Sequence, residues 1–297
     1  WFQIQTFSPT LDGGVRGLFI GGGYPNNQNI IDFVTISIAG NATDFGDLNN
    51  ATLLQGACSS RTRGLAAGAY PSASNVIDFV TISSTGNAQD FGDRTTTGYN
   101  LGGLSNETRG IFFGGHAPAD RDVIDFVTIA STGNAIDFGN LLSVTHGIIG
   151  CASPTRGVMG GNSTPNNVIQ FVTIASTGNA QDFGDLIRST HNMGSASNAT
   201  RGLFGGGSQG PTNEIQFITI ATLGNATDFG DLEQSRSALS STASSTRAVF
   251  SNGQTNPATQ TTMDYVAIAT GGKAVDFGDS LDSTSAAVSI SNAHGGL

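Results

Sequence analysis

Short runs of hydrophobic residues alternate with polar turns along the whole chain, and residues 146–186 show the pattern in full. This stretch reads HGIIGCASPTRGVMGGNSTPNNVIQFVTIASTGNAQDFGDL, with four strand-length runs bounded by Gly, Pro, Asn and Ser, which predicts four β-strands joined by turns. In the third run, Ile169, Phe171 and Thr173 share one face, while Val172 and Ile174 share the other. Both faces are mostly apolar, so we expect the sheet to be covered on both sides.

The same unit occurs six times. Its two markers are the first Asp of a phrase close to GNAxDFGDL and the Arg of a TRG motif, and each recurs every 45 to 48 residues. Two independent markers with one period indicate a structural repeat. The markers are Asp44, Asp90, Asp137, Asp182, Asp228 and Asp276, and Arg16, Arg63, Arg109, Arg156, Arg201 and Arg247.

Four-stranded units that are sandwiched between copies of themselves are typical of propeller blades. We therefore predict an all-β fold, a six-bladed β-propeller of four-stranded blades with a period of about 46–47 residues. The final segment, 285–294, matches the first strand of a unit but is followed by no second strand. We expect Ala286–Ser291 to complete blade one and close the ring. The predicted domain spans residues 16–297, preceded by a lead-in segment, 1–15.

Composition narrows the possible partners. The 297 residues include 22 acidic and 12 basic ones, a net charge of −10, and the bases are spread evenly, so nucleic-acid binding is not expected. No run of 18 apolar residues occurs, so we expect no membrane insertion. Cys58 and Cys151 occupy equivalent positions one whole blade apart, which predicts two small buried thiols and no disulfide.

The repeated DFGD phrase invites two catalytic or metal-binding interpretations. Protein kinases use DFG once, beside other motifs that are missing here, and calcium needs more oxygen ligands than two carboxylates separated by Phe. A structural role is favoured: one Asp–Arg ion pair per blade would tie the fourth strand to the second, in the same blade or the next. The Phe would fill the gap between blades, and Gly46 and its equivalents would permit a bend.

No catalytic set stands out, and we expect no enzyme, metal or cofactor. The four histidines, His116, His146, His191 and His294, lie in loops without a metal-ligand spacing, which predicts exposed polar residues. A propeller glycosidase would need an Arg cluster with Tyr and Glu, and an oxidase would need a Tyr/His/Cys set. The chain has three Glu and four Tyr, so such sets are hard to assemble.

The turns predict one uniform and one varied face. The turns between the first and second strands (A–B) and the third and fourth (C–D) are nearly constant, whereas the B–C loops and the D–A connections between blades all differ. Variation on a fixed scaffold is where recognition is normally built, although weakly constrained loops would drift in the same way. The candidate binding residues on the varied face are Tyr24, Tyr70, Tyr99, His116, Arg121, His146, Arg188 and His191.

These units resemble kelch repeats in the Gly doublet that closes the second strand (FGG, MGG), in the period and in closure by a terminal strand. They depart from kelch in carrying Phe126 or Tyr265 on the third strand and no Trp within the repeats. The wording TRGxFGGG…IDFVTIASTGNAxDFGDL more specifically resembles repeat proteins of tailed bacteriophages of marine bacteria, described as virion structural or tail-fibre-like.

The phage resemblance implies a non-enzymatic propeller on the surface of a virion, structural or host-recognising. Its partners would be other virion proteins, or a glycan or protein of the host surface, and a homo-oligomer is compatible with this role. The alternative is an intracellular kelch-type scaffold for protein interactions. A propeller glycosidase is a third, less favoured interpretation.

Overall fold

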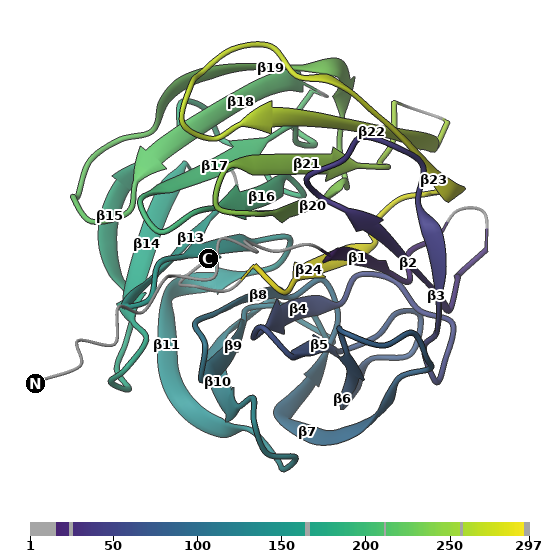
Figure 1. Ribbon diagram of the computed structural model, residues 1–297. Helices are drawn as coiled ribbons and strands as arrows, with labels where there is room; N and C mark the ends of the chain where they lie inside the picture. The colour runs from purple at the N-terminus through teal and green to yellow at the C-terminus, as the bar shows by residue number, and fades with distance from the viewer. Residues whose placement is uncertain (1–15, 24–25, 164–166, 211, 256–257, 294–297) are drawn as a thin grey trace, which may run out of the picture.

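The computed structural model describes residues 16–23, 26–163, 167–210, 212–255 and 258–293, which form 24 strands and no helix (Figure 1). The strands build six four-stranded antiparallel sheets, set around a central axis as a six-bladed β-propeller. The predicted fold class is therefore confirmed. The predicted lead-in 1–15, Tyr24 and His294 lie outside the described residues. Within the described part of the chain, no helix could cross a membrane.

Each blade runs from an inner strand to an outer one. In order from the axis, the strands of blade one are β24 (Val288–Ser291), β1 (Arg16–Ile20), β2 (Ile30–Thr35) and β3 (Thr43–Asp47). Blades two and three are β4 (Gly56–Ser59), β5 (Arg63–Ala67), β6 (Ser74–Thr81), β7 (Gln89–Gly98), and β8 (Gly102–Ser105), β9 (Arg109–Phe113), β10 (Arg121–Thr128), β11 (Ile136–Thr145). Blades four, five and six are β12 (Ile149–Ala152), β13 (Arg156–Gly160), β14 (Val168–Thr173), β15 (Gln181–Asp185); β16 (Gly194–Ser197), β17 (Arg201–Gly205), β18 (Thr212–Thr219), β19 (Thr227–Arg236); and β20 (Ser240–Ala243), β21 (Arg247–Ser251), β22 (Gln260–Ala267), β23 (Val275–Thr284).

Blade one is assembled from both ends of the described chain. β24 pairs antiparallel with β1, and the register sets Gly17 opposite Ser291 and Ile20 opposite Val288. In Figure 1 the yellow β24 lies beside the purple β1. The expected closure of the ring by a C-terminal strand is therefore confirmed.

The six inner strands surround a narrow central channel of about 170 Å³. Its lining is rich in Gly, Ala and Ser, and hydroxyls link neighbouring blades: Ser59 Oγ donates to the carbonyl of Ser291 at 2.8 Å, and Ser105 Oγ to that of Ser59 at 2.7 Å. Small residues let the inner strands approach closely. The sulfur atoms of Cys58 and Cys151 are buried and unpaired, as expected, and burial raises the pKa of both thiols.

The DFG of each repeat forms a β-bulge in the outer strand. In blade one, Gly46 lies opposite Ile31 and Asp44 opposite Asp32, which leaves Phe45 without a partner residue. Phe45 turns into the core between blades one and two and is 2% exposed. Gly46 has φ +150° and its counterparts have φ between +138° and +148°, a region that favours glycine. The predicted roles of this Phe and this Gly are confirmed.

The GNA turn of the next blade packs directly on this bulge. The N–H of Gly86 donates to the carbonyl of Phe45 (2.8 Å), that of Ala88 to Asp47 (2.8 Å), and Asn87 Oδ1 accepts from the N–H of Asp47 (3.1 Å). A Cβ on Gly46 would lie 2.5 Å from the carbonyl oxygen of Gly86, so no other residue fits without a shift. The two backbone bonds recur at all six junctions, which we call the blade seams. The repeated phrase is therefore the joint between blades.

The expected Asp–Arg ion pairs do not form among the described residues, and this prediction was wrong. The six marker Asp side chains are exposed. Each marker Arg instead stacks on the third-strand Phe or Tyr of its own blade, with 4.1–5.0 Å between the guanidinium carbon and the ring centroid. Its Nη1 donates, at 2.8–3.2 Å, to the carbonyl of an Ile that follows the third strand of the next blade. The arginines do link blades, but through a backbone acceptor and an aromatic face.

A buried acid or amide on each third strand makes a further link to the preceding blade. Gln170 Oε1 accepts from the N–H of Leu142 (2.8 Å), and Gln216 Oε1 accepts from that of Ile187 (2.8 Å). The residues at this position are Asp32, Asp78, Asp125, Gln170, Gln216 and Asp264, all buried. Two of these acids form buried ion pairs, Asp125 with Arg94 and Asp264 with Arg236.

Candidate functional site

The face that carries the B–C loops and D–A connections is framed by a closed ring of backbone hydrogen bonds. One residue from each D–A connection donates its N–H to the preceding member and accepts from the next, with N···O distances of 2.5–3.1 Å. Each non-glycine member has a positive φ of 51–61°, and Gly147 has 67°. The members of this amide ring are Leu54, Asn100, Gly147, Asn192, Ala238 and Ala286.

Beside each ring member sit two positions whose side chains vary. One directly precedes the ring member, and the other lies in the B–C loop next to it. Tyr99 and His116 exemplify the pair, since their backbones exchange two hydrogen bonds of 2.8 and 3.2 Å. Leu53 and Tyr70 form the corresponding bridge one blade earlier. The fold thus holds both side chains at fixed places on this face.

Five aromatic side chains follow one another across this face. The ring centroids of Tyr70 and Tyr99 lie 5.1 Å apart, those of Tyr99 and His116 5.5 Å, those of His116 and His146 5.4 Å, and those of His146 and His191 6.5 Å. They come from the loops and connections of blades two to five, and Tyr70 is 40% exposed while the others are half-buried. We call this set the aromatic arc. The structure therefore brings together five of the eight residues predicted from the sequence.

An acid lies within the arc. Asp120 Oδ1 is 2.7 Å from His116 Nδ1 and 2.8 Å from His146 Nδ1, and Ser163 Oγ donates to Oδ2 at 3.1 Å. Burial alone would raise the pKa of Asp120, but the hydrogen bonds from the two histidines outweigh it and lower that pKa. The carboxylate is therefore charged at neutral pH. The acid joins a histidine of the B–C loop of blade three to a histidine of the connection between blades three and four.

The last histidine of the arc has a different environment. Burial, and then the charge of His146, lower the pKa of His191, so its imidazole stays neutral to lower pH than an exposed histidine. Its Nδ1 is buried and has no hydrogen-bond partner within the described residues. This nitrogen is a polar atom available to a ligand that reaches it.

Among the described residues, the opposite side of the amide ring carries no such set. The equivalent pairs are Ser237 with Gln254 and Ser285 with Gly23, and their backbones are bridged in the same way. Small or uncharged residues thus occupy the positions that hold aromatic rings in blades two to five. The scaffold is nearly six-fold symmetric, whereas the side chains on this face are not.

Three predicted residues do not join the arc. The guanidinium of Arg121 folds back on its own loop and donates to the carbonyl of Ala117, while Arg188 forms an ion pair with Glu214. Neither makes a described hydrogen bond, ion pair or ring contact with the arc. The third, Tyr24, is the residue outside the described part of the chain.

Sequence analysis missed Asp120 and Ser163, and it treated the histidines as separate loop residues. His116 and His146 are 30 positions apart, in different kinds of connection, so no local spacing reveals their contact. The usable signal is alignment of the repeats by their seams, which places His116 and Ser163 at equivalent loop positions. His146 then stands beside Ser163, as Tyr99 stands beside His116.

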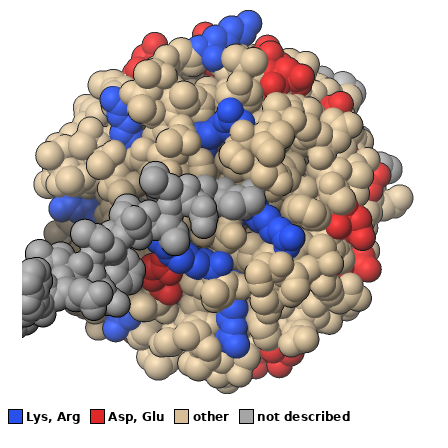
Figure 2. All heavy atoms as spheres, viewed as in Figure 1, with Lys and Arg blue, Asp and Glu red and all other residues tan. Residues whose placement is uncertain are grey.

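Figure 2 shows Lys and Arg spread over the side of the molecule that it presents, with Asp and Glu mostly near the rim. No protein-family model matches the chain, and no curated protein is significantly similar to it. The class of the protein is defined by its fold alone: it is a six-bladed β-propeller.

Proposed function

We propose that this protein is a non-enzymatic recognition propeller that binds an uncharged glycan through the aromatic arc. The observation that carries the proposal is that, among the described residues, five contacting aromatic rings lie together on one side of an otherwise repetitive face. Drift under weak constraint would scatter such residues over all six blades. A contiguous set on a rigid frame is the arrangement expected of a binding site.

The chemistry of the arc suits a sugar. Tyrosine and histidine offer flat apolar faces with polar edges, so they can pack against the C–H face of a pyranose and still bond its hydroxyls. Asp120 adds one ionised acceptor. The net charge of −10 disfavours strongly anionic ligands at long range.

The biological setting we propose is the surface of a virion, where such a propeller would recognise the host or decorate the particle. This rests on the likeness of the repeat wording to phage tail-fibre-like proteins. The kelch-like scaffold alternative would need a peptide-binding groove. The central channel is narrow and lined by inner strands, so it does not provide such a groove.

Glycan-array and whole-cell binding by the 297-residue chain test the proposal. The test variants are Tyr70→Ala and Tyr99→Ala, and the matched controls are Ser237→Ala and Gln254→Ala, at equivalent positions on the opposite side. We expect at least about a tenfold loss of affinity for the test variants and little change for the controls. Failure of the folded chain to bind any glycan or cell, or equal losses in both sets, would overturn it.

A further inference from the structure

We propose that His116, Asp120 and His146 form a zinc-binding site at the junction of blades three and four. One donor atom from each residue lies within 4.8 Å of the other two. The inference is independent of the proposed function, because it rests only on these three side chains and their surroundings.

The donor set favours a transition metal. Two imidazole nitrogens and a carboxylate oxygen are ligands that zinc accepts readily, whereas calcium and magnesium prefer sites made of oxygen alone. Asp120 Oδ1 now lies between the two Nδ1 atoms, at 2.7 and 2.8 Å. Ligand bonds of ~2.0–2.1 Å in a tetrahedron separate neighbouring donors by about 3.3 Å. Each of the two separations between Asp120 Oδ1 and a histidine Nδ1 therefore needs to lengthen by only about half an ångström.

The surroundings allow that movement and hold the acid in place. The side chains of His116, His146 and Asp120 are 32%, 30% and 22% exposed, so none is locked in a packed core. Ser163, from the B–C loop of blade four, donates to the second oxygen of Asp120. Such an outer hydrogen bond orients a metal-ligating carboxylate.

The site has three protein ligands, which leaves one tetrahedral position for water or another ligand. The partial exposure of all three residues puts that position in reach of solvent. An ion bound here would also join the loop of blade three to the connection into blade four. We therefore expect zinc to raise the thermal stability of the protein as well as bind to it.

Isothermal titration of the full chain with zinc chloride is the primary test, with calcium and magnesium chloride as comparison titrants. We expect one zinc ion per chain and a rise in Tm, with neither effect from calcium or magnesium. The variants His116→Gln and His146→Gln should bind zinc at least about tenfold more weakly. His191→Gln, which removes a histidine of the arc outside the site, should bind as the wild type does.

Cobalt(II) provides a second readout. Its visible absorption spectrum should show tetrahedral coordination in the wild type and lose it in Asp120→Asn, a change that preserves side-chain size. Circular dichroism of each variant checks that the fold is intact. The proposal is overturned if the folded wild type binds no zinc, or if the His116→Gln/His146→Gln double variant binds it with unchanged affinity. Glycan binding measured with and without a chelator remains a separate result, so either proposal can fail alone.

Discussion

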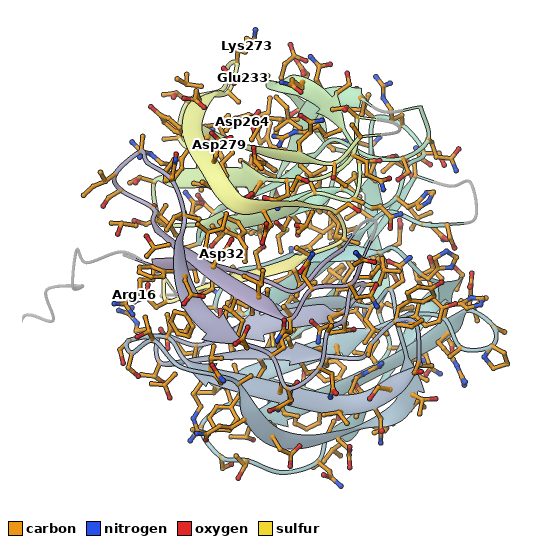
Figure 3. The ribbon with its side chains drawn as sticks, turned by 90° about the vertical axis from the view of Figure 1, so that its right-hand side faces the viewer. Arg16, Asp32, Glu233, Asp264, Lys273 and Asp279 are labelled. Atoms are coloured by element: carbon orange, nitrogen blue, oxygen red, sulfur yellow. The ribbon has the colours of Figure 1, made fainter. Side chains whose placement is uncertain are left out.

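Asp32 is a buried acid whose equivalents in two other blades are amides. Its Oδ2 accepts from the N–H of Leu281 at 3.2 Å, and its Oδ1 has no hydrogen-bond partner within the described residues (Figure 3). Burial raises the pKa of Asp32 to about 6; the hydrogen bond from Leu281 opposes this, and the charges of Asp282 and Asp44 add to it. The folded protein therefore holds this proton more tightly than the unfolded chain. The contribution of Asp32 to stability is greatest below the unfolded pKa of 3.8 and declines as pH rises through about 6.

We expect Asp32→Gln to raise Tm by a few degrees at pH 7.5, because it removes a charge that is costly to bury. The gain should shrink as the pH is lowered towards 4, where Asp32 in the wild type is protonated. Thermal unfolding of both proteins between pH 4 and pH 8 measures this difference.

The matched control for Asp32→Gln is Gln216→Glu, which places an acid where this position holds an amide and should therefore lower stability at high pH. Histidine titration affects wild type and variant alike, so it cancels in the comparison. An identical pH profile for wild type and Asp32→Gln would contradict the explanation.

The residue scale also shows the limit of sequence analysis. Six identical positions indicated that the marker Arg matters, but they could not identify its partner, because the acceptor is a backbone carbonyl of another blade. The buried acid of the third strand was overlooked, since a carboxylate in an apolar run gives no sign of the N–H it will accept.

At the scale of elements, the seams explain why the chain repeats GNAxDFGD. Five of the six seams have an Asn whose Oδ1 accepts from the outer strand of the preceding blade at 3.0–3.1 Å. In the sixth, Lys273 replaces Asn, and it has no oxygen to accept the N–H of Asp231. Figure 3 shows Lys273 extending away from the ribbon. The seam between blades five and six therefore lacks a side-chain hydrogen bond that the other five seams have.

We expect Lys273→Asn to increase the free energy of unfolding by about 0.5–1.5 kcal/mol, the usual net value of one added hydrogen bond. The reciprocal change, Asn134→Lys, should lower the free energy of unfolding by a similar amount. Urea denaturation measures both. If the two substitutions change the free energy of unfolding in the same direction, the hydrogen bond of Asn is not the reason why this position affects stability.

At the scale of the whole molecule, strand β24 is what makes the ring closed. Besides pairing with β1, it places Ile290 against Gly64 of blade two, where a Cβ on that glycine would lie 1.7 Å from Ile290 Cδ1. Its Ser291 accepts from Ser59 Oγ. The C-terminal strand thus contacts blades one and two together.

Deletion of residues 286–297 should therefore leave blade one without its inner strand and remove one member of the amide ring. We expect that the truncated protein no longer unfolds in one cooperative transition, or that its Tm falls by more than about 10 °C. Differential scanning calorimetry measures both effects. Addition of a peptide spanning 283–297 should restore part of the loss. A truncated protein that melts like the wild type would show that closure contributes nothing.

The blade count, strand order and closure could be predicted because the repeat encodes each of them locally. The site could be predicted only in part, because it depends on which loops the ring brings together. All five residues of the arc were predicted because they lie on the varied face. The cluster of His116, Asp120 and His146 could not be predicted, because it forms only when blades three and four pack side by side.

The amide ring has a consequence for the evolution of this protein. Its bonds run between main-chain atoms, so they do not depend on which side chains stand next to them. Tyr99, His146 and Ser237 occupy equivalent places beside this ring although their side chains differ. A new specificity could therefore arise by single substitutions, without rebuilding a loop. The side chains beside the amide ring can therefore be exchanged while the backbone stays the same, so a library of binding proteins could be engineered on this one scaffold.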